Sequence, residues 1–298
     1  QYVRQFTQPI TQIANISNVL QQTAAAAERV FAFLEEEEEQ ADPKDSLPSE
    51  AIDGSVYFAH VHFGYVPEKT IINDFSAIIK PGTKVAIVGP TGAGKTTMVK
   101  LLMRFYDVSS GAVLLNGYDV KQFSRKNLRD SFGMVLQDTW LYNDTIRENI
   151  RFGRLDATDE EVIEAAKAAQ VDHFVRTLPQ GYDTILNEEA SNVSQGQKQL
   201  LTIARTILSN PKILILDEAT SSVDTRTEIM IQRAMDKLTE GRTSFIIAHR
   251  LSTIRDADVI LVMKDGDIVE TGNHEELLAK GGFYAELYQS QFADMKEE

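Results

Sequence analysis

Residues 89–96 have the composition and spacing of a phosphate-binding loop, G-x-x-x-x-G-K-[ST]. A glycine-rich turn between a strand and a helix directs several backbone N–H groups at one point, where the helix dipole adds positive potential. Lys95 is expected to reach the β- and γ-phosphates of a nucleotide, and the Thr96 hydroxyl to take a Mg²⁺ position. The candidate nucleotide-binding residues here are Gly89, Pro90, Thr91, Gly92, Ala93, Gly94, Lys95, Thr96 and Thr97.

Two carboxylates follow the apolar segment 213–216, which predicts a buried strand. Such a strand carries acidic side chains to the carboxyl end of a parallel sheet, where ligands bind in α/β folds. Asp217 is suited to hold Mg²⁺, directly or through water. Glu218 is a candidate general base that polarises an attacking water. About 120 residues after a phosphate loop, an apolar run ending in Asp-Glu is a specific signal for nucleotide hydrolysis.

Ser194, Gly196 and Gln197 open an apolar-periodic helix. Ser194 and Gln197 have the spacing of a capping box, which predicts an ordinary helix start. The same helix N-terminus is alternatively a second binding point for a phosphate. The spacing alone favours the ordinary helix start.

Three further residues, His249, Gln137 and Tyr65, are candidates for contacting a nucleotide. His249 and Gln137 each follow a predicted strand, at residues 244–247 and 132–136. His249 is a candidate for contacting the γ-phosphate, and Gln137 for coordinating Mg²⁺ or positioning water. Tyr65 is a candidate for stacking on adenine. Their ordinary interpretations are a structural or surface histidine, a loop glutamine and a core tyrosine.

The composition describes a globular protein and excludes several classes of chemistry. The chain has 298 residues, of which 43% are hydrophobic and 25% charged. It contains no cysteine, so disulfides, thiolate metal sites and thiol catalysis are excluded. A formal net charge of −14 disfavours nonspecific nucleic-acid binding. No uninterrupted apolar stretch is long enough to predict a complete membrane span, and no signal peptide is visible.

Residues 1–34 predict a single helix, because apolar side chains recur at three- and four-residue steps. Its other face is weakly polar, which suits packing against other helices or lining a cavity; an amphipathic helix on the globular domain fits the pattern equally. Pro9 is expected near the helix start, where proline is tolerated. The five consecutive acidic residues 35–39 and the prolines at 43 and 48 predict a linker.

From Ser55 onward, strands and helices alternate, which predicts an α/β domain with a helical insertion in the middle. A hairpin turn is expected at Asn116-Gly117, and a capping box at Thr158–Glu161. Strands are expected at 56–63, 71–79, 85–88, 112–115, 132–136, 213–216, 244–247 and 259–263. Helical segments are expected at 97–103, within 145–185, and at 194–208, 224–239 and 252–256.

In this order, the motifs resemble the nucleotide-binding domain of ATP-binding cassette (ABC) transporters. Residues 221–224, with Ser-Ser-Val-Asp, also resemble the family pattern, with Ser222 and Val223 at positions where alanine and leucine are common. The segments 138–142 and 145–150 are similar to the exporter subfamily, in which a membrane domain precedes the cassette in one polypeptide. The resemblance covers residues 51–292 and rests on six or seven motifs at family spacing.

The resemblance implies binding and hydrolysis of ATP with Mg²⁺, coupled to export. It implies two cassettes paired head to tail, as a homodimer or heterodimer with a second ABC subunit, each loop facing Ser194 and Gly196 of the other chain. Glu218 is then the base, His249 holds the γ-phosphate and water in register, and ATP binding closes the dimer. The cassette is expected on the cytoplasmic side of the cell membrane, without nucleic acid.

The same resemblance predicts a fold and a domain division. The fold is a P-loop NTPase cassette of the α/β class, with a mainly parallel core sheet, an antiparallel β subdomain, a helical subdomain at about 138–210 and a preceding helix. Residues 1–34 are predicted to be the cytoplasmic end of the last transmembrane helix, and 35–50 a linker. Residues 51–292 form the nucleotide-binding domain and 293–298 a C-terminal tail. The membrane domain itself is expected to be missing from this chain.

The sequence departs from the family pattern at Gln195, where the signature usually has glycine, and at 187–189, which replaces a glycine-rich stretch. Function is expected to survive, since Ser194 and Gly196 are kept. A soluble cassette ATPase acting on DNA or ribosomes is disfavoured by the net charge of −14. A separate importer subunit is disfavoured by the helix at 1–34, and a non-hydrolysing cassette by the presence of Glu218 and His249.

Overall fold

The computed structural model divides the chain into two units, residues 1–41 and 42–298, which are described separately. The residues that the structure describes are 2–136, 139–187, 192–217, 223–247 and 251–292. Gln137, Glu218 and His249, which the sequence analysis assigned to catalysis, therefore lie outside the described residues.

The first unit is dominated by one helix, α1 (Tyr2–Leu34). This element matches the predicted helix, but Pro9 lies in its interior rather than at its first turn. Proline there removes one backbone hydrogen bond without ending the helix. No residue of α1 is buried, and its apolar side chains are exposed. Among the helices in the described ranges, none combines the length and hydropathy needed to cross a bilayer.

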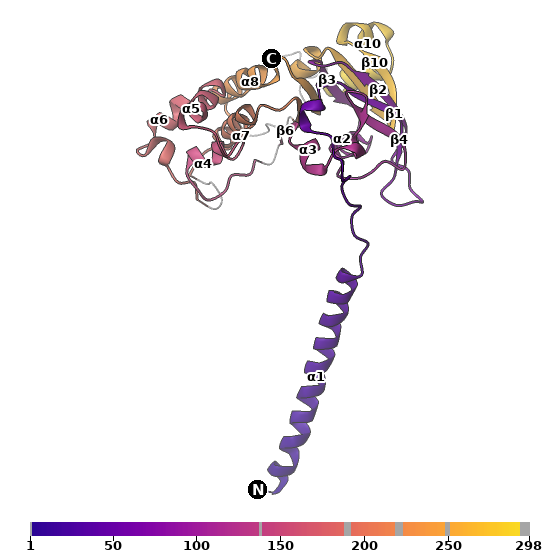
Figure 1. The fold of residues 1–298 in the computed structure, drawn as a ribbon, viewed down its shortest axis with the longest axis vertical. Coiled ribbons are helices and arrows are strands. Elements are labelled where there is room, and N and C mark those ends of the chain that lie inside the picture. Colours follow the sequence, from indigo (N-terminus) through magenta and orange to yellow (C-terminus); the bar gives the residue numbers. More distant parts are fainter. Residues whose placement is uncertain (1, 137–138, 188–191, 218–222, 248–250, 293–298) are drawn as a thin grey trace. The chain divides into compact units, whose positions relative to one another are not determined.

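A six-stranded sheet, which includes the labelled strands β10, β3 and β6, lies in the second unit (Figure 1). The order of its strands is β10-β9-β3-β8-β7-β6. Strands β9, β3, β8, β7 and β6 are parallel, and β10 pairs antiparallel with β9. The strands are mostly buried apolar runs, which suits a parallel sheet covered on both faces. Their bounds are β3 (Lys84–Val88), β6 (Phe132–Val135), β7 (Ile213–Asp217), β8 (Thr243–Ile247), β9 (Val259–Lys264) and β10 (Asp267–Gly272).

A four-stranded antiparallel sheet, in the order β2-β1-β4-β5, completes the β structure. The predicted hairpin turn at Asn116-Gly117 is confirmed, with φ of 50° and 79°, the left-handed values that a tight two-residue hairpin needs. The bounds are β1 (Val56–Phe63), β2 (Ile72–Ile79), β4 (Ser110–Leu115) and β5 (Tyr118–Asp119).

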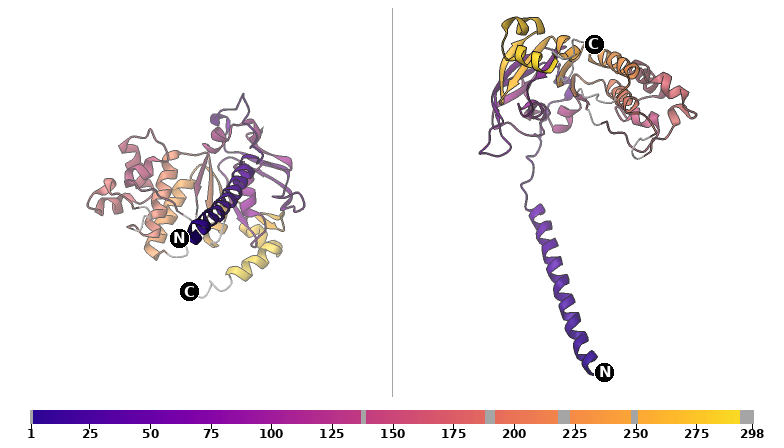
Figure 2. Two further views of the ribbon diagram at one scale, coloured as in Figure 1. Left: turned by 90° about the horizontal axis from the view of Figure 1, so that it is seen from below. Right: turned by 180° about the vertical axis from the view of Figure 1, so that it is seen from behind.

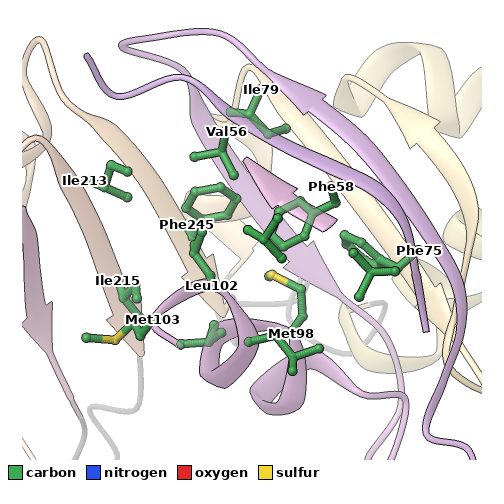
Figure 3. Packing of buried hydrophobic residues seen from close by; sticks show 14 of the residues in the cluster. Val56, Phe58, Phe75, Ile79, Met98, Leu102, Met103, Ile213, Ile215 and Phe245 are labelled. Carbon is green, nitrogen blue, oxygen red and sulfur yellow. The ribbon is translucent and has the colours of Figure 1, made fainter. Parts of the chain in front are cut away.

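The core between the two sheets is apolar and includes side chains of α2, the helix after the phosphate loop (Figure 3). Phe58 of β1 meets Phe75 of β2 at 4.9 Å between ring centroids and Phe245 of β8 at 6.5 Å, both nearly edge to face. Met98 and Leu102 of α2 belong to the same cluster. This packing fixes α2, and with it the end of the phosphate loop, against the sheets.

Helices α4–α7 gather on one side of the second unit, away from β1, β2 and β4 (Figures 1 and 2). The capping box at Thr158–Glu161, which starts α5, is confirmed. The described helices of this unit are α2 (Lys95–Leu102), α3 (Arg125–Arg129), α4 (Ile146–Arg151), α5 (Asp159–Ala168), α6 (Asp172–Thr177), α7 (Gln195–Ser209), α8 (Thr225–Thr239), α9 (Leu251–Arg255), α10 (His274–Lys280) and α11 (Phe283–Phe292), with 3₁₀ turns at Ser49–Ala51, Val120–Gln122 and Gly181–Asp183.

The later part of the predicted linker is attached to the second unit. Arg125 forms an ion pair with Asp42 at 2.6 Å, and the Ser46 hydroxyl accepts a hydrogen bond from the backbone N–H of Ser124 at 2.6 Å. Leu47 pairs with Phe123 as an isolated bridge. The chain is therefore anchored at the start of α3 before β1 begins.

A buried amide holds the helical part of this unit together. Asn149 is fully buried, and its Nδ2 donates to the carbonyls of Tyr142 and Thr145, both at 3.0 Å. Its Oδ1 accepts from the Tyr142 N–H at 3.1 Å and from Arg205 at 3.1 Å. Arg205 also donates to the backbone carbonyl of Asn149 at 2.9 Å. The segment before α4 is thereby bound to α7.

Replacing Asn149 by alanine is expected to lower the free energy of unfolding by about 2–3 kcal/mol, because buried partners lose their hydrogen bonds together. Urea denaturation followed by circular dichroism measures this change. The matched control is Asn192→Ala, since exposed Asn192 donates one hydrogen bond, to the carbonyl of Ile185. Equal denaturation midpoints for the two variants would show that the Asn149 network contributes little.

Candidate functional site

The parallel strands place the carboxyl ends of β3, β8, β7 and β6 side by side at one edge of the sheet. Ile87 of β3 is in register with Ile247 of β8, and Ile247 with Asp217 of β7. Leu216 of β7 is in register with Val135 of β6. Ligands in such sheets bind beyond this edge. The phosphate loop follows β3, and the segments containing His249, Glu218 and Gln137 follow β8, β7 and β6.

The phosphate loop leaves β3 and returns at the N-terminus of α2, as the sequence predicts. Gly94, the residue before α2, has φ of 98°, which strains any residue with a Cβ atom. An added Cβ there would also meet the Ile72 side chain at 2.8 Å. At Gly92 an added Cβ would meet nothing within 4 Å, so this part of the loop faces open space. The first N–H groups of a helix have no carbonyl partner within it, so those of α2 are suited to bind an anion.

Lys95 is bound by its own loop. Its Nζ donates hydrogen bonds to the carbonyl oxygens of Gly89, at 2.7 Å, and Pro90, at 3.0 Å. Partial burial lowers the pKa of Lys95 from its ordinary value, and the negative charge of Asp217 opposes this shift. Since burial disfavours the charged ammonium, a further anion in the cavity stabilises it.

A cavity of about 420 Å³ brings together Tyr65, most of the phosphate loop and Asp217. It is formed by four segments far apart in the sequence: the β1–β2 connection with Tyr65, the phosphate loop with the start of α2, the end of β7 and the end of β8. The residues that line it are Tyr65, Ile71, Thr91, Gly92, Ala93, Gly94, Lys95, Thr96, Thr97, Asp217 and Ile247. Gly89 and Pro90 contribute through their carbonyl contacts with Lys95 instead.

Thr96 and Asp217 supply oxygen atoms to the same cavity. Hydroxyl and carboxylate oxygens are the ligands that Mg²⁺ prefers, and Mg²⁺ commonly binds through one or two protein oxygens plus substrate phosphates. Within the described ranges no group of three or more histidine and carboxylate side chains is placed to hold a metal by itself. The donor set therefore fits a Mg²⁺ ion carried by a polyphosphate.

Tyr65 lines the cavity from the β1–β2 connection and is half exposed. Its hydroxyl lies 3.2 Å from the Thr97 Oγ1 of α2. The buried Phe63 ring meets it at 5.0 Å and 83°. The interpretation of Tyr65 as a buried core tyrosine is thus disfavoured, because its ring lies at the cavity wall and remains accessible.

Ser194, Gly196 and Gln197 do not line this cavity. The capping box is present: Gln197 N–H donates to Ser194 Oγ at 3.3 Å, and Gln197 Oε1 accepts from Ser194 N–H at 2.8 Å. At Gly196 an added Cβ would meet the Thr227 side chain of α8 at 2.4 Å. Helix packing within this chain therefore requires glycine there. Gln195, the departure from the family pattern, donates from Nε2 to Thr139 Oγ1 at 3.2 Å.

Two residues beside the cavity were missed by the sequence analysis. Tyr106, which follows α2, meets the Tyr65 ring at 5.1 Å between centroids. The Lys100 ammonium of α2 lies over the Tyr65 ring at 5.6 Å. The sequence shows an aromatic pair, residues 105–106, directly after the predicted helix. No local pattern shows that Tyr106 contacts the distant Tyr65 ring.

The chain is similar to known transporter proteins along nearly its whole length. Residues 72–221 match the protein family described as "ABC transporter". A Mycobacterium bovis protein named "Fatty acid ABC transporter ATP-binding/permease protein" is 58% identical over 96% of this chain and 45% of its own length. A Bacillus subtilis protein named "Uncharacterized ABC transporter ATP-binding protein YfiC" is 50% identical over 98% of this chain and 48% of its own.

A solved structure, described as a bacterial Atm1-family ABC exporter with ATP bound, superposes with a TM-score of 0.81 at 41% identity. The superposed region covers 98% of this chain and 51% of the solved exporter chain. The chain thus spans about half the length of the curated relatives it matches. These similarities confirm the family and the P-loop cassette fold that the motifs predicted, and the chain belongs to the ABC transporter family.

Proposed function

We propose that residues 51–292 are the ATP-binding and ATP-hydrolysing motor domain of an ABC exporter. The cavity at the sheet edge is the observation that carries this proposal, because it combines the phosphate loop, Asp217 and an accessible aromatic ring. A triphosphate fits the loop and α2 N-terminus, a Mg²⁺ ion fits Thr96 and Asp217, and an adenine ring fits Tyr65.

In this proposal, Lys95 exchanges its bonds to the Gly89 and Pro90 carbonyls for bonds to the β- and γ-phosphates. The α2 N–H groups hold the same phosphates, while bound Mg²⁺ supplies neutralising charge. Glu218 accepts a proton from water as the water oxygen attacks the γ-phosphorus. The bond from that phosphorus to the β–γ bridging oxygen breaks, and ADP leaves. His249 and Gln137 hold the γ-phosphate and the water in register.

The signature residues support a shared site. Ser194 and Gly196 stand at the N-terminus of α7, a helix of 15 residues, yet they do not line the cavity of their own chain. A helix N-terminus is suited to bind a phosphate, so the partner that completes it is a second ABC subunit, facing head to tail. ATP then joins the loop of one chain to Ser194, Gly196 and Gln197 of the other, and hydrolysis releases them.

Hydrolysis by the chain is expected to be slow and to rise more steeply than linearly with protein concentration, because dilution separates the two halves of each site. Phosphate release measured across a concentration series, with light scattering for the dimer fraction, tests this expectation. Strict proportionality down to concentrations at which only monomer remains would contradict a shared site.

Mixing two defective variants provides the control. Lys95→Ala removes the loop cation and Ser194→Ala alters the signature, so a mixed dimer has one intact site and one doubly altered site. Activity in the mixture above the sum of the separate variants supports sharing between chains. Activity equal to that sum supports a site contained in one chain.

The rest of the transporter is proposed from the relatives. A Mycobacterium bovis relative is named as an ATP-binding/permease protein, and this chain spans 45% of it. We infer that a membrane domain adjoins the cassette, that residues 1–34 are the cytoplasmic end of its last transmembrane helix and that 35–50 link the two. Residues 293–298 form a tail, and the helical subdomain lies at about 138–210. The cassette then works at the cytoplasmic face of the cell membrane, without nucleic acid.

A further inference from the structure

Helix α2 ends in a turn that fixes where the following chain goes. Phe105 N–H donates to the Lys100 carbonyl at 2.8 Å, and Arg104 N–H donates to the Leu101 carbonyl at 3.0 Å. Arg104 has φ of 52°, in the left-handed region. These two bonds around one left-handed residue are the Schellman arrangement at a helix C-terminus. The chain therefore reverses directly after α2 instead of continuing away from it.

The side chain of Arg104 holds this turn in place. It is buried, with a relative exposure of 4%, and Nε forms an ion pair with Asp107 at 3.0 Å. Its Nη1 donates to the Phe123 carbonyl at 3.2 Å. A left-handed conformation is unfavourable for a residue other than glycine, so these contacts offset a local cost. Tyr106 lies between the two ion-paired residues, and its backbone position is set by them.

Tyr106 belongs to a cluster of aromatic rings around Tyr65. The Tyr65 and Tyr106 rings lie 5.1 Å apart at 85°, and both contact the buried Phe63, at 5.0 and 5.7 Å. Lys100 Nζ lies 5.6 Å from the Tyr65 centroid and 5.9 Å from that of Tyr106. Phe63 and Tyr106 meet Tyr65 nearly edge to face. Neither ring therefore takes the parallel position that a stacked nucleobase requires.

We propose that Tyr106 is a positioning residue for nucleobase recognition, which holds the Tyr65 ring in the orientation that stacks on the base. The inference rests on the proposed ATP site. In this proposal, α2 contributes to binding at both ends of the nucleotide. The N-terminus of α2 binds the phosphates, and the turn after its C-terminus orients the Tyr65 ring that stacks on the base. Lys100, on the same helix, lies over both rings, and its ammonium attracts the face of each.

Tyr106→Leu in the full chain tests this role, with MgATP and Mg-tripolyphosphate as paired probes in a binding titration. Affinity for MgATP is expected to fall about 3- to 10-fold, the value of one aromatic pair contact. Affinity for tripolyphosphate is expected to stay within about 2-fold, because it has no base. Tyr106→Phe keeps the ring and is expected to restore the affinity for MgATP.

A double mutant separates positioning from a general structural effect. In a Tyr65→Leu background, Tyr106→Leu is expected to change MgATP affinity by less than about 2-fold, since the ring to be positioned is gone. The proposal would be overturned if Tyr106→Leu weakened the binding of MgATP and tripolyphosphate equally, or left the affinity for MgATP unchanged. It would also be overturned if Tyr106→Leu lowered the affinity for MgATP by the same factor, about 3- to 10-fold, in the Tyr65→Leu background. Failure of the unaltered chain to bind either probe would instead overturn the proposed ATP site.

Discussion

Glu218→Gln is expected to keep ATP binding while reducing steady hydrolysis by about 10²- to 10⁴-fold, the usual contribution of a general base. Glutamine has nearly the same size and shape, but its amide does not accept a proton from the attacking water at neutral pH. Glu218 directly follows β7, whose last residue, Asp217, lines the cavity. Phosphate release gives the hydrolysis rate, and nucleotide fluorescence gives the affinity.

Such a variant is also expected to accumulate as a closed dimer with ATP, because closure no longer leads to hydrolysis. Light scattering with and without MgATP measures this shift in mass. The matched control is Glu164→Gln, which removes an exposed carboxylate paired with Lys167, a surface contact of little energetic weight. Near-normal hydrolysis by Glu218→Gln would remove Glu218 from the role of base.

The phosphate loop could be predicted from sequence because its determinants are local. Three glycines, one lysine and two threonines stand within eight residues, and the flanking segments 84–88 and 95–102 show their strand and helix character directly. The capping box at Ser194–Gln197 was predictable for the same reason, since both of its hydrogen bonds close within one helical turn.

Strand β10 and the helices α10 and α11 were not predicted, although one signal was present. Asp265-Gly266 forms a tight turn with φ of 49° and 87°, the same kind that was recognised at Asn116-Gly117. The strand that follows it, β10, is only partly buried, so its sequence shows weak periodicity. Its pairing with β9 supplies the stability that its own pattern does not reveal.

The neighbours of the site residues were hidden because they come from distant segments. Position 196 requires glycine because a larger residue would collide with Thr227, and Tyr65 contacts Tyr106. The two residues of each pair are far apart in the sequence. The order of the sheet, with β8 between β3 and β7, is likewise set by crossovers that one sequence does not specify. Motifs therefore identified Tyr65, the loop residues and Asp217 among those that line the cavity, but not Ile71 or Ile247, and the topology determined which of them meet.

Lys95→Ala is expected to lower ATP affinity by about 100-fold or more, since a hydrogen bond to a charged group contributes up to about 3 kcal/mol and Lys95 is placed to serve two phosphates. The loop would also lose the cation that joins the Gly89 and Pro90 carbonyls, so its conformation would be held less firmly. Titration with a fluorescent ATP analogue measures the affinity.

Lys80→Ala is the matched control, because Lys80 is an exposed lysine at the end of β2 and does not line the cavity. If attraction of ATP by general positive charge were sufficient, the two variants would weaken binding equally. We expect instead that only Lys95→Ala does so, because its ammonium lies inside the loop, near the opposing charge of Asp217. Tight ATP binding by Lys95→Ala would count against the phosphate loop, and with it against the cavity, as the site where the triphosphate binds.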